Sequence, residues 1–285
     1  SRQHVTVALG GEGADELFGG YLTHRADRYA EWARITPRGL RRLALRAAQM
    51  VPASDDKISF EYKVKRFLQG SLLSREAAHV FWNGTFSEGE KREFFNGADA
   101  APMAELLSNV GSGKGIEPFL RFDQAYYLPD DILYKVDRMS MAHSVEVRPP
   151  FLDERIVRFA ASLPEHLKLR GSDSKIVLRR LMENKLPPAI LGRSKMGFDI
   201  PVHDWFRSSL KPFLLETINQ DSVRESGLFA WRGVELILRR HLERKANLGY
   251  HLWGLMTLLL WMKRWKITVG ATTASERLEA HDIVV

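Results

Sequence analysis

The chain has 285 residues, of which 45% are hydrophobic and 27% charged, and it contains no cysteine. This length suits one large globular domain or two modest ones, and the lack of cysteine excludes a disulfide scaffold, a thiolate zinc site, an iron–sulfur cluster and a cysteine nucleophile. The formal net charge of +7 would suit a nucleic-acid partner. The basic residues are dispersed along the sequence, however, so we expect no nucleic-acid partner.

The first residues predict a buried strand from His4 to Leu9, because a β-branched run ends there in two glycines. They show no secretory signal peptide. The most apolar stretch, Leu252 to Met262, is too short to span a membrane and predicts a buried helix. We therefore expect a cytoplasmic protein without a membrane partner.

Almost everything after this strand has helical periodicity. Several boundaries carry specific signals: Pro37 starts an Arg-rich helix, Ser87 and Glu90 are spaced as a capping box, and Asp153 is placed to cap a helix. The predicted helices cover residues 28–35, 37–50, 57–69, 75–83, 87–95, 117–128, 130–144, 153–162, 172–184, 231–245 and 250–266.

Two of these predicted helices are separated by Pro129, and Asp130 is expected to cap the second. Residues 145–150 are expected to be extended, because the residue before a proline avoids helical geometry. One strand cannot form a sheet. We therefore expect a mostly α chain with one N-terminal strand, a fragment or processed product of an α/β domain whose parallel sheet has its other strands upstream. Residues 1–268 would be the domain portion, and residues 269–285 a polar, disordered tail.

The segment from Gly10 to Tyr21, GGEGADELFGGY, is the first that can carry chemistry. A strand that runs through glycines into a helix places backbone N–H groups where α/β proteins bind phosphates. Glu12 and Asp15 would be compatible with such a site if a divalent cation lay between carboxylate and phosphate. Alternatively, acidic residues in this turn only complement the helix dipole.

A second segment combines a charged helix with an extended stretch. Lys135 and Arg138 share a helix face, which indicates either a nearby anion, compensation by Asp137, or a solvated surface. Glu146 and Arg148 project to the same side of the extended stretch, as a pocket wall or as a salt-bridged edge.

Two lysines complete the candidate residues. Lys175 is predicted in the first turn of a helix capped by Ser172 or Asp173, where a cation opposes the helix dipole. That placement suits either an anion clamp or a surface lysine in solvent. Lys195 lies in the loop of residues 193–201, which either closes over a nucleotide or simply connects two helices.

Four motifs in order resemble the asparagine synthetase family. GGEGADELFGGY (10–21) is similar to its GEGxDExFGGY element, and LPDDILYKVDRMSMAHSVEVRPPFLD (128–153) to its most distinctive stretch, LPxxLLxKxDRxSMAxSxExRxPFLD. SDSKIVLR (172–179) resembles its lysine-bearing helix, and RSKMGFDIPVHDW (193–205) a loop of one bacterial branch. The resemblance implies an adenine nucleotide α-hydrolase-like domain, also called an ATP-pyrophosphatase domain, in which helices flank a parallel sheet.

The resemblance implies a carbon–nitrogen ligase of asparagine biosynthesis that uses ATP and Mg²⁺. ATP would adenylate the β-carboxylate of aspartate with release of pyrophosphate, and ammonia from glutamine would displace AMP. A glutaminase domain, upstream or separate, would supply the ammonia, and the full enzyme would be a homodimer. The implied magnesium ligand is Asp15, and the implied catalytic residues are Lys175, Glu146 and Tyr21. The implied substrate and ATP contacts are Gly11, Glu12, Gly13, Asp137, Arg138 and Lys195.

Two family features are missing from this sequence: the SGGxDS loop that binds ATP, and the N-terminal cysteine of the glutaminase domain. Two alternatives therefore remain open. The same chemistry could act on another carboxylate, such as that of a β-lactam precursor, a peptide or a glycan uronate. The chain could also be a non-catalytic segment that binds a partner.

Overall fold

The computed structural model describes residues 2–52, 60–96, 101–111, 113–193, 200–267 and 269, without the side chains of residues 101 and 102. Lys195 and the predicted tail from residue 270 onward lie outside the described residues. The chain divides into two compact units. The first comprises Ser1–Arg42, Gln69–Asn83 and Ala101–Gly197, and the second comprises Leu43–Leu68, Gly84–Ala100 and Phe198–Val285.

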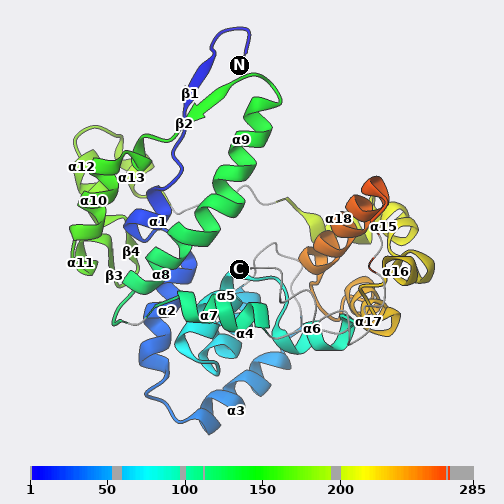
Figure 1. Ribbon diagram of the computed structural model, residues 1–285. Helices are drawn as coiled ribbons and strands as arrows, with labels where there is room; N and C mark the ends of the chain where they lie inside the picture. The colour runs from blue at the N-terminus through cyan, green and yellow to red at the C-terminus, as the bar shows by residue number, and fades with distance from the viewer. Residues whose placement is uncertain are drawn as a thin grey trace, which may run out of the picture. The chain divides into compact units, whose positions relative to one another are not determined.

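The first unit contains the N-terminal strand as β1 (Val7–Leu9) and its parallel neighbour β2 (Glu146–Arg148) (Figure 1). The strand is shorter than the predicted His4–Leu9, and the prediction that it is buried was wrong, since Val7 and Leu9 are exposed. Val7 lies opposite Glu146, and Leu9 opposite Arg148. A second, antiparallel pair joins β3 (Leu169–Arg170) to β4 (Asp173–Ser174). The expectation of a single strand was therefore wrong. Residues 146–148, which were predicted only to be extended, form the strand that pairs with β1.

Helices make up most of the first unit, and a small core of Leu17, Phe18 and Ala160 joins two of them, with Val177 and Leu178 of a third packed against it. Asp153 caps its helix as predicted, since its side chain accepts a hydrogen bond from the Arg155 N–H. The elements are α1 (Ala14–Phe18), α2 (Leu22–Ala33), α5 (Arg75–Asn83), α7 (Ala101–Asn109), α8 (Glu117–Phe122), η1 (Asp123–Leu133), α9 (Tyr134–Met141), η2 (Pro150–Leu152), α10 (Glu154–Ser162), α11 (Glu165–Lys168), α12 (Ile176–Met182) and α13 (Pro188–Leu191).

The predicted break at Pro129 is absent. A π-helix, η1, runs through Pro129 and continues directly into α9. Proline lacks the N–H that an α-helix would use and its ring clashes with the preceding turn, whereas the wider π geometry pairs residues five apart. Asp130 therefore lies inside a continuous helical stretch and does not cap a helix.

The second unit is helical, with a core that includes Phe94, Phe206, Leu214, Val234 and Leu252. The capping box of Ser87 and Glu90 is present as predicted. Its helices are α6 (Glu88–Phe94), α14 (Val202–Arg207), α15 (Lys211–Thr217), α16 (Gln220–Ser226), α17 (Trp231–Leu242) and α18 (Gly249–Trp265), while α3 (Arg38–Gln49) and α4 (Phe60–Ser71) cross from one unit to the other. None of the helices described here combines the length and apolar character needed to cross a membrane.

Candidate functional site

The turn between β1 and α1 is held by backbone contacts that require glycine. The Gly10 N–H donates to the Arg148 carbonyl (3.0 Å), which ties the turn to β2. Gly13 has a φ of 89°, and a β-carbon there would lie 2.3 Å from Leu152 Cδ2. Gly13 therefore lets this short turn, residues 10–13, lead from β1 into α1.

Asp15 and Lys175, which are far apart in the sequence, meet at this turn. Lys175 Nζ lies 3.1 Å from Asp15 Oδ1, and the two side chains are 29% and 22% exposed. A β-carbon on Gly20 would fall 1.8 Å from Asp15 Oδ1 and 2.3 Å from Lys175 Cε. Glycine at position 20 thus makes room for an ion pair that remains partly open to solvent.

Lys175 is not in the first turn of a helix, so this prediction was wrong. It is the residue immediately before α12 and adopts a left-handed conformation with φ 54°. Asp173 and Ser174 belong to β4 and cap nothing, while the Lys175 N–H donates to the Phe18 carbonyl (3.2 Å). The position of Lys175 is therefore fixed by the strand pair β3–β4 and by the end of α1, and not by a helix cap as predicted.

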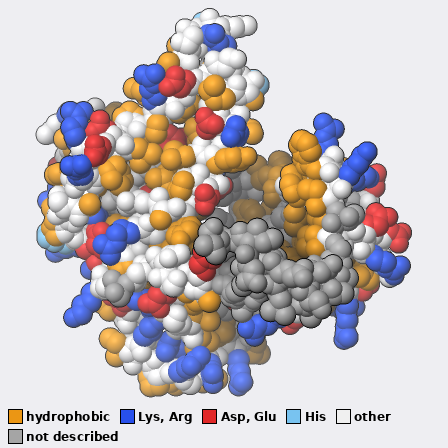
Figure 2. Space-filling view, in the orientation of Figure 1, with side chains coloured by type: hydrophobic (Ala, Val, Ile, Leu, Met, Phe, Trp, Pro, Cys, Tyr) orange, Lys and Arg blue, Asp and Glu red, His pale blue; other side chains and the backbone are white. Residues whose placement is uncertain are grey.

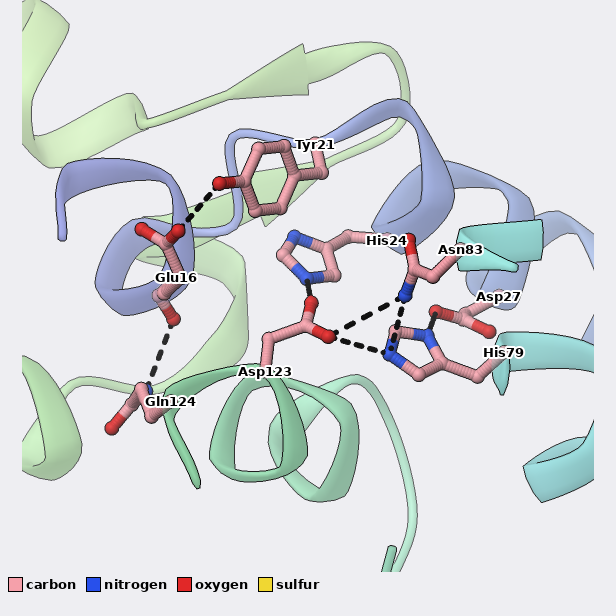
Figure 3. Close-up of polar contacts among 8 residues, drawn as sticks. All are labelled: Glu16, Tyr21, His24, Asp27, His79, Asn83, Asp123 and Gln124. Atoms are coloured by element: carbon pink, nitrogen blue, oxygen red, sulfur yellow. Dashed lines mark hydrogen bonds and ion pairs between the residues drawn. The ribbon is translucent and has the colours of Figure 1, made fainter. Parts of the chain in front are cut away.

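Tyr21 is paired with Glu16. The Tyr21 hydroxyl donates to Glu16 Oε1, and Glu16 is almost fully buried (Figure 3). Burial and the adjacent carboxylate raise the pKa of Tyr21 far above its ordinary value, so its hydroxyl stays protonated. Glu146, by contrast, is exposed on β2, where the Arg148 Nε donates to its Oε1 (2.8 Å).

The charged residues of α9 lie on a solvated face. Asp137 and Arg138 are both exposed and lie 4.0 Å apart, and the Arg138 guanidinium lies over the Tyr134 ring at 5.2 Å. Lys135 contacts Asp131 at 3.8 Å. Only weak surface ion pairs hold these side chains in place, and their contact with substrate or ATP remains a prediction.

A buried network of histidines and aspartates, which the sequence did not suggest, lies beside the Tyr21–Glu16 pair (Figure 3). His79 bridges two carboxylates, with its Nδ1 2.7 Å from Asp27 Oδ2 and its Nε2 3.0 Å from Asp123 Oδ1. His24 Nε2 lies 2.8 Å from Asp123 Oδ2, and the Asn83 amide nitrogen lies 3.4 Å from Asp123 Oδ1. Three elements, α2, α5 and η1, therefore share one polar centre.

The contacts of this network favour a positively charged His79. Both ring nitrogens of His79 lie near carboxylate oxygens, which favours a doubly protonated ring, although the Asn83 amide nitrogen also lies 3.1 Å from Nε2. Burial alone would lower the pKa of His79, but the two aspartates outweigh it and raise that pKa to about 9. Burial raises the pKa of Asp27, whereas the hydrogen bonds from His24 and His79 hold the pKa of Asp123 below its usual value despite its burial.

The network reaches the candidate site through two contacts. The Gln124 amide, next to Asp123 in the chain, donates to the Glu16 carbonyl (3.0 Å). The Tyr21 ring packs against the His24 ring, with centroids 5.4 Å apart. The buried charges thus support the helix that carries Asp15 and Glu16. The spacing of His24 and Asp27 on one face of α2 is the sequence signal that could have indicated the network.

The residues present fit a magnesium ion only in part. The described residues contain no group of three His, Cys, Asp or Glu side chains arranged to hold a metal. Asp15 offers one half-buried carboxylate, and the buried Glu12 Oε2 has no hydrogen-bond partner within the part of the chain described. Mg²⁺ commonly takes one or two carboxylates and completes its shell with phosphates and water, so these two residues suit that ion.

Comparison with known proteins identifies the family of this chain. The asparagine synthase family model matches residues 1–263, and the chain belongs to this family. It is 28% identical over 266 residues to asparagine synthetase (glutamine-hydrolyzing) 1 of Bacillus subtilis, covering 92% of this chain and 41% of that protein. It is 30% identical over 267 residues to a putative asparagine synthetase (glutamine-hydrolyzing) of Mycobacterium tuberculosis, covering 92% and 40%.

A more distant relative is named an amidase and not an asparagine synthetase. Amidase chry2 of Gibberella zeae is 25% identical over 259 residues, covering 82% of this chain and 38% of that protein. The chain spans about two fifths of the length of these curated relatives. No solved structure matches the chain.

Proposed function

We propose that this chain is part of an ATP-dependent amide ligase that converts aspartate to asparagine. ATP adenylates the β-carboxylate with release of pyrophosphate, and ammonia derived from glutamine displaces AMP. The Asp15–Lys175 pair carries the proposal, because it joins an acidic and a basic group at the carboxyl end of a strand in a parallel pair, where nucleotide phosphates bind in α/β domains. Membership of the asparagine synthase family supports it.

Each site residue has a proposed role. The Lys175 amine stabilises the negative charge that develops as the acyl-adenylate forms, since a fixed cation is most effective where charge builds up. Asp15, with Glu12 beside it, holds a magnesium ion, which when bound neutralises phosphate charge. Tyr21 and Glu146 position the carboxylate acceptor. The remaining contacts to ATP and substrate come from Gly11, Glu12, Gly13, Asp137, Arg138 and Lys195.

The proposed partners follow from this reaction. Aspartate and ATP are the substrates of this part of the enzyme, and a glutaminase domain, upstream or separate, delivers ammonia. The full enzyme is proposed to be a homodimer, and the domain to be an ATP-pyrophosphatase of the adenine nucleotide α-hydrolase type, which the parallel pair β1–β2 supports.

Aspartate-dependent exchange between ATP and pyrophosphate in the full-length protein tests the proposal. Asp15→Asn and Lys175→Ala are expected to abolish exchange, because each removes one charge of the pair. Lys185→Ala is the matched control, since this lysine is exposed beyond the end of the same helix and has no role in the proposed site. Exchange that persists in both site variants would refute the assignment.

A second candidate function keeps the chemistry and changes the carboxylate. The relatives named amidase chry2 and amidase chyE favour it, since their names do not refer to asparagine synthesis. The same exchange assay separates the two candidates: exchange that is independent of aspartate but stimulated by another carboxylate, such as a peptide or a uronate, would support the second.

A further inference from the structure

The helix α3 (Arg38–Gln49) has an apolar face that packs against nothing buried. None of its residues is buried. Leu40, Leu43, Ala44 and Ala47 recur at helical spacing and are all exposed. In an ordinary surface helix this apolar face would cover the core, and the polar face would meet solvent. The orientation of α3 is therefore the reverse of the usual one.

A different face attaches the start of α3 to the first unit. Arg41 lies on that face and donates to the Thr36 carbonyl (3.1 Å) and to the Ser71 carbonyl. Leu45 and Ala48, four and seven residues later, follow Arg41 along the same helix face, and both are half-buried. The attachment by Arg41 thus leaves the apolar face of α3 open.

The open face continues into the corner between α2 and α3, within the first unit. Trp32, Ile35 and Leu40 are 58%, 82% and 56% exposed. In Figure 2, orange apolar side chains and blue Lys or Arg side chains lie next to one another along the lower edge, where Figure 1 draws α3. An exposed apolar patch rimmed by charge is typical of a binding surface.

The charged residues of α3 and of the chain on either side of it are all basic. Between Glu31 and Asp55 the sequence contains five arginines and no acidic residue. Arg38, Arg42 and Arg46 recur every four residues along one exposed side of α3, next to the apolar face. A helix with a basic side and an apolar side matches a surface that is anionic outside and apolar beneath.

We propose that α3 and the α2–α3 corner form a peripheral docking surface for an anionic lipid membrane, with the apolar face inserted among the headgroups and the arginines on the phosphates. A nucleic acid would match the arginines but leave Trp32, Ile35 and Leu40 in water. A second copy of this chain would place arginines against arginines in a symmetric interface. This proposal departs from the expectation of no membrane partner, which rested on the lack of a spanning segment. The finding that no described helix could span a membrane concerns crossing and not binding at the surface. The inference is independent of the proposed ligase activity.

Vesicle flotation tests the proposal, with phosphatidylcholine vesicles that contain or lack phosphatidylglycerol. We expect the chain to float only with phosphatidylglycerol present, and less at high salt. A basic residue near an anionic surface strengthens binding about fivefold, so R38Q/R42Q/R46Q should weaken it on the order of a hundredfold. L40S/L43S should also weaken it, because it removes the inserted side chains.

The variant R158Q/R180Q/R239Q is the control, since it removes the same charge from exposed arginines on other helices. All these positions are exposed, and circular dichroism spectra would verify that each variant is folded. Equal loss in the control, or equal flotation with phosphatidylcholine alone, would overturn the proposal. It would also be overturned by DNA binding without flotation, or by a dimer in lipid-free solution that L40S/L43S dissociates.

Discussion

The imidazolium of His79 is expected to stabilise the first unit, because it lies between two buried carboxylates. His79, Asp27 and Asp123 are all essentially inaccessible to solvent. Replacing His79 by Gln removes the positive charge that bridges Asp27 and Asp123, and Asp123 keeps only its contacts with His24 and Asn83. Removing one partner from a buried ion pair costs about 3–5 kcal/mol, so we expect the free energy of unfolding to fall by that amount.

The pKa of His79 predicts how this stabilisation depends on pH. The pKa rises from an ordinary value of 6.5 in the unfolded chain to about 9 in the folded protein. Each pKa unit corresponds to about 1.4 kcal/mol, so the full effect is about 3 kcal/mol. Because the folded state has the higher pKa, the contribution is fully present below pH 6.5 and is lost as the pH rises from 6.5 to 9.

Two measurements check this reasoning. In ¹⁵N-histidine NMR spectra, the His79 ring should remain doubly protonated until the pH approaches 9. In urea unfolding, the free energy of unfolding of His79→Gln should no longer depend on pH between 6.5 and 9. The double variant Asp27→Asn/His79→Gln should lose less unfolding free energy than the sum of the losses in the two single variants. The exposed His143→Gln serves as control. Titration of His79 near pH 6.5, or additive effects in the double variant, would refute the charge assignment.

Three further predictions concern stability. His241 is buried, and burial together with the nearby Arg207 lowers its pKa to about 4, so stability should fall by at most about 3 kcal/mol as the pH drops from 6.5 to 4. His241→Asn should flatten this dependence in urea unfolding at several pH values, since its amide oxygen can still accept the Leu248 N–H that bonds Nδ1 now; an unchanged profile would contradict it. Gly13→Ala should lower the thermal midpoint, at a cost of at least about 1 kcal/mol, because of its positive φ and the contact with Leu152, and a neutral result would show that the turn relaxes. Ser87→Ala should cost about 1 kcal/mol of unfolding free energy by removing the capping box, whereas Ser87→Asp, which can still cap, should cost less.

Local signals in the sequence predicted the local structure well. The caps at Ser87 and Asp153 were confirmed, because a side chain that bonds its own helix start depends only on neighbouring residues. The predicted break at Pro129 was wrong because proline interrupts a helix of α geometry, whereas this stretch is a π-helix. The cap assigned to Ser172 or Asp173 was wrong because pairing between β3 and β4 overrides the local preference of those residues.

Contacts between distant segments could not be predicted in the same way. His79 lies 52 residues from Asp27 and 44 from Asp123 in the sequence, and no periodicity links them. The motifs around Asp15 and Lys175 were identified separately, but only the fold shows that the two side chains form an ion pair. Likewise, the sequence predicted an Arg-rich helix after Pro37 but gave no indication that its apolar side is exposed.

The left-handed backbone of Lys175 has a consequence for engineering this domain. A non-glycine residue in this conformation costs about 1–2 kcal/mol, whereas a half-exposed ion pair such as that with Asp15 contributes about 0–1 kcal/mol. Selection for heat resistance alone would therefore favour glycine at position 175. Thermostability screens commonly improve a fold at the expense of its active site, and here the gain in rigidity would remove the amine on which the proposed adenylation depends.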